Sequence, residues 1–445
     1  MGAKPYPAYR DSGVEWIGDI PEHWEVKKLK NHIESKSDVF VDGDWIESPY
    51  ITDNGYRLVQ TGNVGIGKYK EQGNRYISPE TFKQLRCTEV LPDDLLICRL
   101  ADPVGRACMA PNLGVRMVTS VDVAILRLGN INQHQYLTYF FSSSEYLLYM
   151  ESVCRGGTRD RVSRSFLGSV FLPSPPLQEQ KQIASFLDRE TSKIDTLIGK
   201  QQQLINLLKE KRGTLISHTV TKGLNPNVPM KDSGVEWIGD IPEHWEVRRL
   251  SRSVKLIGSG TTPKSDNTDF YSEDGTPWLN TGDLNDGNVQ DIPKRVSDLA
   301  LSTHSALRIY PSESVVIAMY GATIGKLGVI GIPCTCNQAC CVMAAGDSHT
   351  NEYLFLGLMS ARTALISAAV GGGQPNISQQ DIKALLVPSP PLEEQKQIAS
   401  FLDQETSKID TLIEKANQSI ALLKERRSSL ISAAVTGKID VREAA

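Results

Sequence analysis

Apolar residues recur every three or four positions along two long stretches of the chain, residues 172–223 and 387–438. This spacing places the apolar side chains on one stripe of an α-helix, with Lys, Glu, Gln and Asp around the rest. Near its start each stretch has Pro-Ser-Pro-Pro, which favours a helix start and cannot continue a strand. At 1.5 Å per residue, forty helical residues make a rod of roughly 60 Å.

The two stretches are copies of each other, because 37 of 52 positions are identical at a constant offset of 215. Identity at this level indicates an internal duplication. A lone helix with such a stripe would leave it exposed to water, so the simplest partner of each helix is the other copy. The residues predicted to line the helix–helix interface are Ile183, Leu187, Ile194, Leu197, Leu204, Leu208, Leu215, Ile398, Leu402, Ile409, Leu412, Ile420, Leu423 and Leu430.

A shorter repeat precedes each helix at a distance, because residues 11–29 match residues 232–250 at 17 of 19 positions. Each copy carries two Trp residues among Gly and Pro, which favours docking anchors. We expect a structural role for His23 and His244, since no nucleophile or set of metal ligands lies near them in the sequence.

The order of these parts predicts a geometry. The first helix must end beside the second short module, and the second helix must end beside the first module if the repeat is to close. Two rods that link the same two bodies in opposite senses are antiparallel and are related by a pseudo-twofold axis. We divide the chain into residues 1–171, 172–224, 225–386 and 387–445, that is, module with domain, helix, module with domain, helix with tail.

The two intervening regions read as mixed domains of the α+β class. Both combine short β-rich runs (residues 95–98, 121–126 and 314–319) with turns, and each has a later helical pattern, at residues 136–150 and 352–369. The fold class is therefore α+β, with two mixed domains joined by two long antiparallel helices.

Length, charge and composition favour a cytoplasmic protein of several domains. A chain of 445 residues is too long for one core. Its net charge of −4 argues against a generally basic nucleic-acid coat but leaves room for local basic loops. Sparse cysteine and the absence of a secretory pattern after Met1 indicate a cytoplasmic protein. The most apolar run, residues 315–332, is broken by Gly and Lys, so we expect no membrane segment.

The two domains share glycine-rich loops at matching places, although the loops themselves diverge. Residues 96–106 resemble 316–326, and residues 155–163 occupy the place of 371–378. Glycine allows close approach to DNA, Arg suits guanine or phosphate, Gln and Asn suit adenine, and Lys suits phosphate. The DNA-binding residues predicted in these loops and nearby are Arg99, Arg106, Arg155, Thr158, Arg159, Arg161, Arg164, Lys264, Thr323, Lys326, Gln374 and Asn376.

Several stretches resemble catalytic or metal-binding motifs, but each lacks residues that the motif requires. Residues 62–68 have the spacing of a phosphate loop, but Tyr69 stands where Ser or Thr should hold magnesium. Cys334, Cys336, Cys340 and Cys341 lack a second Cys/His pair at finger-like spacing, which favours buried small hydrophobes over a metal site. We found no Gly-rich cofactor loop and no nuclease-type carboxylate–Lys set. The prediction is a protein without catalytic residues, bound metal or cofactor.

The doubled arrangement resembles the specificity subunit of type I restriction–modification systems. The resemblance rests on DSGVEWIGDIPEHWEV, a divergent domain, PSPPLxEQKQIASFLD and a long helix, all present twice. It implies two target recognition domains spaced by an antiparallel coiled coil, and a bipartite double-stranded DNA target. It also implies two modification subunits that use S-adenosylmethionine and two restriction subunits that use ATP and magnesium. Within the domains, residues 321–326, Asn337, Gln338 and residues 373–376 match stretches that recur in the family, so Asn337 and Gln338 join the predicted DNA contacts.

Two other functions stay open at this level. The first is a coiled-coil interaction adaptor without a nucleic-acid role. The second is a fused restriction–methylation enzyme, which would need the cofactor and nuclease motifs that we did not find. We expect a non-catalytic DNA-recognition subunit that scaffolds methyltransferase and nuclease partners.

Overall fold

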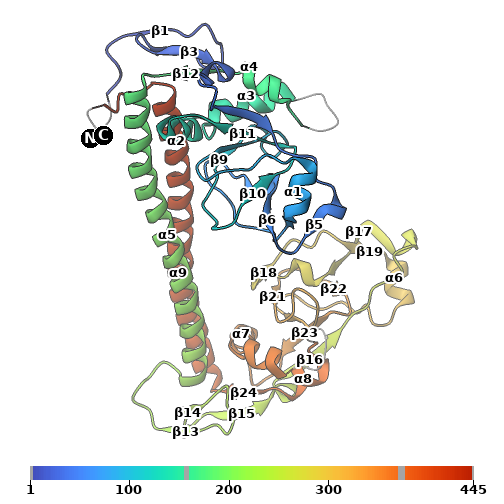
Figure 1. The fold of residues 1–445 in the computed structure, drawn as a ribbon. Coiled ribbons are helices and arrows are strands. Elements are labelled where there is room, and N and C mark those ends of the chain that lie inside the picture. The colour runs from blue at the N-terminus through green and yellow to red at the C-terminus, as the bar shows by residue number, and fades with distance from the viewer. Residues whose placement is uncertain (1–3, 155–159, 369–375, 443–445) are drawn as a thin grey trace. The chain divides into compact units, whose positions relative to one another are not determined.

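The computed structural model describes residues 4–154, 160–368 and 376–442. Its contacts group the chain into two compact units (Figure 1). Unit 1 contains Met1–Gln202 with Asn417–Ala445, and unit 2 contains Gln203–Ala416. Each unit therefore holds one globular head and half of each long helix. The division into four chain segments made from the sequence stays a prediction.

The two long stretches form the helices α5 (Leu177–Lys222) and α9 (Leu392–Val435). Each begins directly after Pro-Pro, where the side-chain amide of Gln180 or of Gln395 donates to a proline carbonyl at 2.8 Å. A glycine with φ of 75° follows each helix, Gly223 directly after α5 and Gly437 two residues after α9. A left-handed residue after the last turn is the common way to stop a helix, and glycine adopts it without strain.

Contacts inside each unit show that the helices run antiparallel, as predicted. In unit 1, Asp195 near the start of α5 pairs with Arg427 near the end of α9 at 3.0 Å. In unit 2, Arg212 near the end of α5 pairs with Asp410 near the start of α9 at 3.2 Å. The two pairs are the same repeat positions with the helices exchanged. Figure 1 shows the start of α5 beside the end of α9.

The helix–helix seam differs in part from the predicted one. Buried or half-buried positions alternate in steps of three and four along both helices, the spacing of a coiled-coil seam. On α5 and α9 these positions are Thr191, Ile194, Ile198, Gln201, Ile205, Leu208, Arg212, Leu215, Thr219, Thr406, Ile409, Ile413, Ala416, Ile420, Leu423, Arg427, Leu430 and Ala434. Of the other predicted residues, Ile183, Leu187, Ile398 and Leu402 are buried.

Three interface predictions were wrong. Leu197, Leu204 and Leu412 are 47%, 44% and 50% exposed. In each case two adjacent apolar residues were candidates for one seam position, and the isoleucine that follows the leucine lies in the seam instead. Ile205, which is 3% exposed, was missed for this reason, and Ala416, also 3% exposed, was missed as well although no apolar residue adjoins it. The periodicity identified the apolar stripe but not which of its residues lie in the helix–helix seam.

The head of unit 1 combines two four-stranded sheets. One is antiparallel in the order β4-β11-β8-β9, and the other has the order β10-β6-β7-β5, with β10 and β6 parallel. The strands are β4 (Val39–Asp42), β5 (Ile51–Thr52), β6 (Tyr56–Val59), β7 (Tyr76–Ile77), β8 (Leu95–Cys98), β9 (Ala107–Met109), β10 (Met117–Thr119) and β11 (Val123–Arg127). The helices are α1 (Pro79–Leu85), α2 (Ile131–Phe140), α3 (Ser144–Cys154) and α4 (Arg164–Ser169). The single helix expected at residues 136–150 is thus two helices, α2 and α3.

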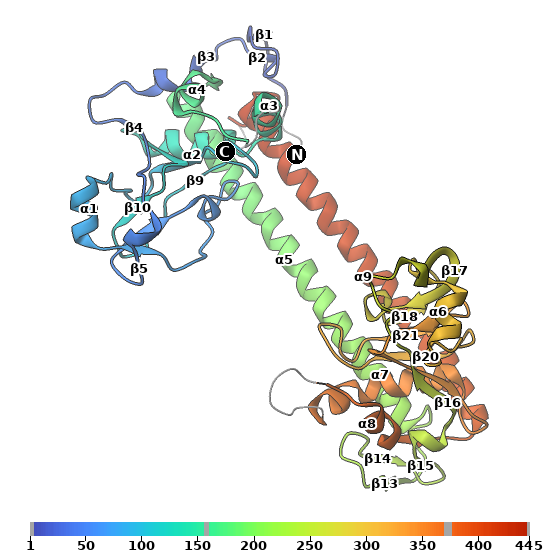
Figure 2. The same ribbon diagram turned by 90° about the vertical axis from the view of Figure 1, so that its right-hand side faces the viewer.

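The head of unit 2 repeats this plan with a larger sheet. Its five-stranded sheet has the order β16-β23-β20-β21-β18, and its three-stranded sheet has the order β19-β17-β22. Figure 2 shows β16, β18, β20 and β21 of the first sheet and β17 of the second. The strands are β16 (Val254–Ser259), β17 (Tyr271–Leu279), β18 (Gly287–Val289), β19 (Arg295–Val296), β20 (Val315–Ala318), β21 (Leu327–Ile330), β22 (Thr335–Cys336) and β23 (Cys340–Ala345). The helices are α6 (Asp298–Thr303), α7 (Asn351–Ala368) and α8 (Gln379–Ala384). Strand pairs β10–β6 and β22–β17 are the matching parallel pairs of the two heads.

The short repeated modules attach each head to a helix end. Each module has a hairpin and a strand that pairs with the strand leading into the long helix. The strands are β1 (Tyr9–Asp11), β2 (Asp19–Pro21), β3 (Glu25–Lys28), β12 (Phe171–Ser174), β13 (Met230–Asp232), β14 (Asp240–Pro242), β15 (Glu246–Arg249) and β24 (Leu386–Ser389). Short 3-10 segments η1 to η6 occupy Leu29–His32, Ser48–Tyr50, Thr61–Asn63, Leu250–Arg252, Thr268–Phe270 and Thr281–Asp283.

The predicted Trp anchors lie where the helices end. Trp24 is 1% exposed and shares a core with Ile431 and Val435 of α9. Trp245 is 0% exposed and shares a core with Ile216 and Val220 of α5. Each module therefore packs against the end of the helix that comes from the other repeat, as the order of parts predicted. Within the described residues, no helix has both the length and the apolar character needed to cross a membrane.

Candidate nucleic-acid interface

In the head of unit 2, three loops meet beyond the end of β20. The backbone N–H of Met319, the residue after β20, donates to the Ala339 carbonyl at 2.8 Å, and Met319 accepts from Ile377 N–H at 2.8 Å. Tyr320 forms a β-bridge with Asn376. These bonds bring residues 320–326, 337–339 and 376 together, which are the three stretches that sequence comparison singled out.

The two residues of the Asn-Gln pair where these loops meet, Asn337 and Gln338, have different environments. Asn337 N–H donates to the Leu279 carbonyl at 3.0 Å, and its side-chain amide donates to Asn280 Oδ1 at 3.1 Å. Gln338 is exposed, and its Oε1 accepts a hydrogen bond from Thr262 Oγ1 at 2.5 Å. Asn337 therefore fixes the loop, while the Gln338 side chain is exposed at its surface.

The remaining predicted residues of this head are accessible. Lys264, Lys326 and Asn376 are exposed, and Thr323 is half-buried with its carbonyl accepting from Lys326 N–H at 2.9 Å. No ion pair involving Lys264 or Lys326 is found among the described residues. Their ammonium groups are available for phosphate. Gln374 lies outside the described residues.

The head of unit 1 brings the equivalent loops together with different side chains. Leu100 forms a β-bridge with Arg161, and Val162 N–H donates to the Arg99 carbonyl at 3.0 Å. The turn after β10 is held as in unit 2, with Ser120 N–H donating to the Val59 carbonyl at 3.1 Å. Arg161 is exposed and pairs with Asp122 of that turn at 2.8 Å.

Two predicted DNA contacts are instead internal braces. Arg106 is 6% exposed, and its guanidinium donates to the carbonyls of Val64 (2.7 Å), Leu100 (3.0 Å), Pro103 (2.8 Å) and Thr61 (2.8 Å). Arg99, 5% exposed, pairs with Asp42 at 3.1 Å and donates to the carbonyls of Val162 and Val121. With their donors used inside the head, neither guanidinium is presented to DNA, so the interpretation of both as DNA contacts was wrong. They build the loops that present Arg161.

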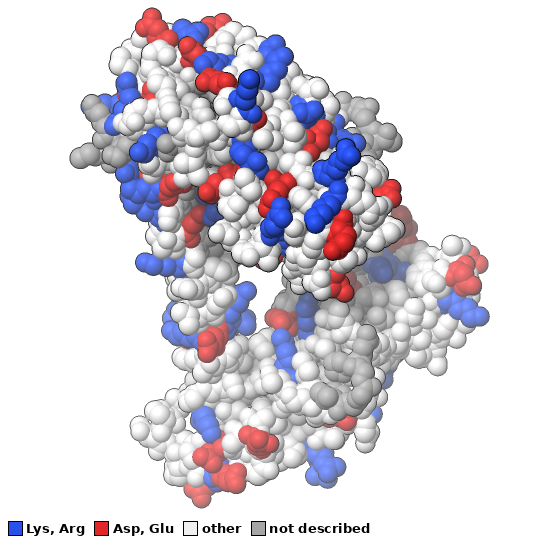
Figure 3. Space-filling view, in the orientation of Figure 1, with Lys and Arg blue, Asp and Glu red and all other residues white. Residues whose placement is uncertain are grey.

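Arg164 has a mixed position. It is half-buried, lies 3.4 Å from Asp42, donates to the Phe40 carbonyl and lies over the Phe40 ring. Most of its contacts are therefore within the head. Arg155, Thr158 and Arg159 fall outside the described residues, so their predicted DNA contacts stay predictions. Figure 3 shows Lys and Arg interspersed with Asp and Glu over the visible face of the unit 1 head, a mixed surface and not a continuous basic coat.

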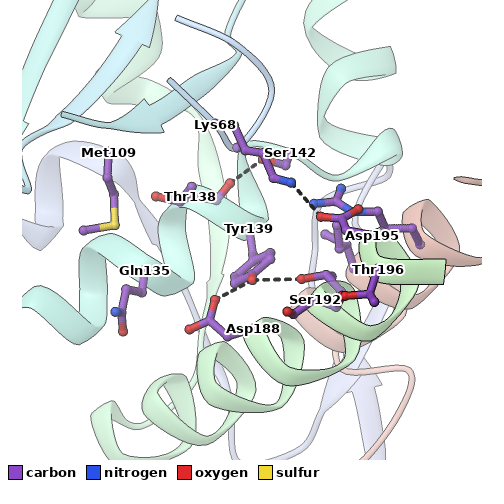
Figure 4. Close-up of a pocket in the computed structure, with 14 residues that line it drawn as sticks. Lys68, Met109, Gln135, Thr138, Tyr139, Ser142, Asp188, Ser192, Asp195 and Thr196 are labelled. Carbon is purple, nitrogen blue, oxygen red and sulfur yellow. Dashed lines mark hydrogen bonds and ion pairs between the residues drawn. The ribbon is translucent and has the colours of Figure 1, made fainter. Parts of the chain in front are cut away.

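Each unit also has a cleft between its head and its helices. The cleft of unit 1 has a volume of about 630 Å³. There Lys68 of the head pairs with Asp195 at 2.6 Å, and Tyr139 donates to Asp188 at 2.5 Å (Figure 4). Burial, followed by the bond to Asp188, raises the pKa of Tyr139, so its hydroxyl stays a donor. The cleft of unit 2, about 660 Å³, has Phe355, Leu356 and Met359 on its head side.

A carboxylate, buried in unit 1 and half-exposed in unit 2, holds each module to the first turn of the helix that follows its head. In unit 1, Glu179 accepts from Tyr6 Oη at 2.6 Å and Trp24 Nε1 at 3.1 Å, and lies 2.8 Å from His23 Nε2. In unit 2, Glu394 lies 2.7 Å from His244 Nε2 and accepts from Trp245 Nε1 at 2.8 Å. The two histidines thus contact a structural carboxylate, in keeping with the role expected for them.

The cysteine group of unit 2 is buried inside the head. Cys334, Cys336, Cys340 and Cys341 are all 0% exposed. Burial raises the pKa of Cys334, Cys336 and Cys341 to about 12 and also raises that of Cys340. Burial is the largest cause in each case, and it disfavours the thiolate that a metal or an electrophile needs. Among the described residues, no group of three or more His, Cys, Asp or Glu has the arrangement of a metal site.

Comparison with known proteins identifies the family. The type I restriction modification DNA specificity domain matches residues 21–207 and 242–422, one match in each repeat. The chain belongs to this family of specificity domains. Specificity subunits of the family are generally non-catalytic.

Individual relatives and a solved structure agree with this assignment. The chain is 25% identical over 436 residues to a protein of Methanocaldococcus jannaschii provisionally named the type I restriction enzyme MjaX specificity subunit, covering 96% of each chain. It is 21% identical to the type I restriction enzyme EcoKI specificity subunit of Escherichia coli, covering 88% of this chain and 84% of that one. A chain in a solved structure of the type I R-M system superposes with a TM-score of 0.71 at 16% identity, over 94% of this chain and 99% of that chain. The α+β fold with two long helices is therefore that of the family.

Sequence reasoning missed three residues near the loops that meet in each head. They are Thr262 and Asn280 in unit 2 and Trp45 in unit 1. Asn280 stands in an Asn-Thr-Gly-Asp segment (residues 280–283) that is similar to Gln-Thr-Gly-Asn of unit 1 (residues 60–63). Thr262 and Trp45 follow strands whose sequences do not align, so only the strand pairing reveals that their positions correspond.

Proposed function

We propose that this specificity subunit reads a bipartite double-stranded DNA target, with one half-sequence read by each head. The observation that supports the proposal is the pair of matching loop edges. Both are built by the same backbone bonds on a repeated frame, but one presents Arg161 and the other Gln338, Lys264 and Lys326. A shared frame with different exposed donors suits two readers of different sequences.

The experiment is selection of DNA from a library with randomised positions, by the chain assembled with its modification subunit. We expect two short fixed half-sequences separated by an unspecified gap. Lys326→Ala should weaken binding to all sequences and lower the salt slope by about 1, because one phosphate contact is lost. A library recovered without any fixed sequence would favour a protein-interaction adaptor and refute the DNA proposal.

The proposal extends to partners that carry the chemistry. Two modification subunits bind S-adenosylmethionine and methylate adenine, and two restriction subunits use ATP and magnesium. In this proposal the cofactors bind to the partners, and the complex acts in the cytoplasm. Methyl transfer to DNA by the purified chain alone, with S-adenosylmethionine, would overturn the assignment of chemistry to partners and favour a fused enzyme.

The helices offer two equivalent docking surfaces for the modification subunits. Leu197 and Leu422, which is 66% exposed, lie on the helices of unit 1. Their repeat counterparts Leu412 and Leu207, which is 63% exposed, lie on the helices of unit 2. Exposed leucines at the same repeat positions in both units support docking of two copies of one partner, because equivalent surfaces suit identical partners.

Charge substitution tests this docking. Leu197→Asp with Leu422→Asp should remove one modification subunit, and the matching pair in unit 2 the other, as measured by native mass spectrometry. Gln203→Asp serves as the control, because it introduces the same charge at an exposed polar position of α5. If the variant with all four leucines changed to Asp still binds both modification subunits, these subunits bind elsewhere.

A further inference from the structure

Trp45 is an unusual residue in the head of unit 1. It is 68% exposed, the largest exposed fraction among the large hydrophobic residues of the described chain. Its indole N–H donates to Glu47 Oε1 at 3.1 Å, so the ring has a defined hydrogen bond and yet an open face. Burying an exposed tryptophan gains more than burying any other side chain, which is why such residues serve as contacts.

Backbone contacts place Trp45 at the loop edge that presents Arg161. Asp44 N–H donates to the Thr119 carbonyl at 2.9 Å, and Asp44 forms a parallel β-bridge with Ser120. Trp45 therefore directly follows the residue that is bridged to the turn after β10. That turn contains Asp122, the partner of Arg161.

The head of unit 2 has a residue at the corresponding position. A glycine follows the first head strand in both units, and its bare Cα lies against the end of a neighbouring strand. A Cβ would lie 2.2 Å from the Ser120 carbonyl oxygen at Gly43 and 1.6 Å from the Cys336 carbonyl oxygen at Gly260. The second residue after each glycine is Trp45 in unit 1 and Thr262 in unit 2.

The chemistry at this shared position differs between the heads. Thr262 donates to Gln338 Oε1 at 2.5 Å, and both side chains are exposed. The bond leaves the second lone pair of Oε1 and both amide hydrogens of Gln338 available, which is the pairing that adenine requires in the major groove. Trp45 offers an apolar face instead, which suits a thymine methyl group or the face of a base. The nearby carboxylate of Glu47 disfavours a phosphate contact there.

We propose that Trp45 and Thr262 are equivalent specificity-determining positions, one in each head. Trp45 selects its base by apolar contact, and Thr262 selects adenine by orienting the Gln338 amide. The inference rests on the proposed reading of DNA by the two heads. It assigns one function to two residues that follow strands of unlike sequence.

The test is the same library selection, carried out with the chain assembled with its modification subunit. Trp45→Ala should reduce base discrimination about 10-fold at one position of one half-sequence and leave the other half-sequence unchanged. Trp45→Phe should retain the preference. Thr262→Val should relax an adenine preference in the other half-sequence only. Thr262→Ser should retain that preference, because the hydroxyl donor is kept.

Leu91→Ala is the matched control, because Leu91 is 41% exposed and precedes β8, whereas the loop edge follows that strand. Unchanged half-sequences in Trp45→Ala and Thr262→Val would overturn the inference, as would weaker binding to all sequences alike. Loss of folding in Trp45→Ala would also overturn it, since a residue so exposed should not support the core. If the unsubstituted chain selects no bipartite sequence, the DNA proposal itself fails.

Discussion

The carboxylates that join the modules to the long helices allow one substitution to be compared at two repeat positions. Glu179 is 5% exposed and has three hydrogen-bonding partners, Tyr6, His23 and Trp24. The side chain of Glu394 is 37% exposed and has two, His244 and Trp245. The same change should therefore cost more in unit 1.

We expect Glu179→Ala to lower the free energy of unfolding by about 4 kcal/mol, because it leaves buried donors without an acceptor and removes a negative charge from a helix N-terminus. Burial and the Glu179 carboxylate both raise the pKa of Tyr6, so its hydroxyl remains a donor that then lacks its partner. Glu394→Ala should cost about 1 to 2 kcal/mol, since water can replace a half-exposed carboxylate.

Differential scanning calorimetry of the full chain measures the loss, at about 2 to 4 °C per kcal/mol for a unit of this size. Hydrogen exchange at the first turns of α5 and α9 then locates it. Glu393→Ala is the control, because that side chain is 75% exposed and its ion pair with Lys396 is long, at 3.8 Å. Equal losses at the two repeat positions, or a larger loss from Glu394→Ala, would refute the link between burial and cost.

Three further outcomes follow from the structure. Seven residues inserted after Lys200 of α5 and at the facing point of α9 (between residues 421 and 422) keep the three-and-four spacing and add about 10 Å. Mapping of methylated adenines should then show a gap longer by about three base pairs with unchanged half-sequences, and a changed half-sequence would contradict helix-set spacing. N-ethylmaleimide at pH 8 should label Cys154 ahead of Cys334, whose pKa of about 12 leaves about one thiolate in ten thousand; intact-mass spectrometry checks this, and fast labelling of Cys334 would contradict its burial. Arg106→Met should destabilise unit 1 by about 3 kcal/mol in urea unfolding, whereas a stable variant with lost DNA binding would restore Arg106 as a DNA contact.

The duplication carried most of what the sequence could predict. Two near-identical helices, two near-identical modules and their order were enough to predict the antiparallel arrangement and the meeting of each module with the helix of the other repeat. The seam was harder, because Leu197 and Ile198 are equally apolar and only the packing decides which of them is buried. Periodicity places a stripe about two adjacent residues wide, so it cannot decide which residue of an apolar pair is buried.

The candidate interface was predictable by loop but not by residue. The loops at residues 96–106 and 316–326 do occupy matching places, yet Arg106 of the first points inward and Lys326 of the second points outward. An arginine close to several carbonyls is buried at little cost because each N–H finds an acceptor. The carbonyls that accept from Arg106 come from residues 61 to 103, and no local sequence pattern shows that they converge. Trp45 and Thr262 could not be matched at all without the strand pairing.

The clefts show which side of each unit the duplication preserved. On the helix side, Asp195 and Arg427 of unit 1 have the identical counterparts Asp410 and Arg212 in unit 2, and both pairs are formed. On the head side the residues differ, with Lys68 and Tyr139 in one cleft and an apolar group of Phe355, Leu356 and Met359 in the other. A helix surface that is repeated can serve two copies of one partner, whereas heads that differ can read two sequences. Substitution of a head residue such as Trp45 can therefore change what is read without altering the surfaces proposed for assembly, because the two tasks lie on different elements of the chain.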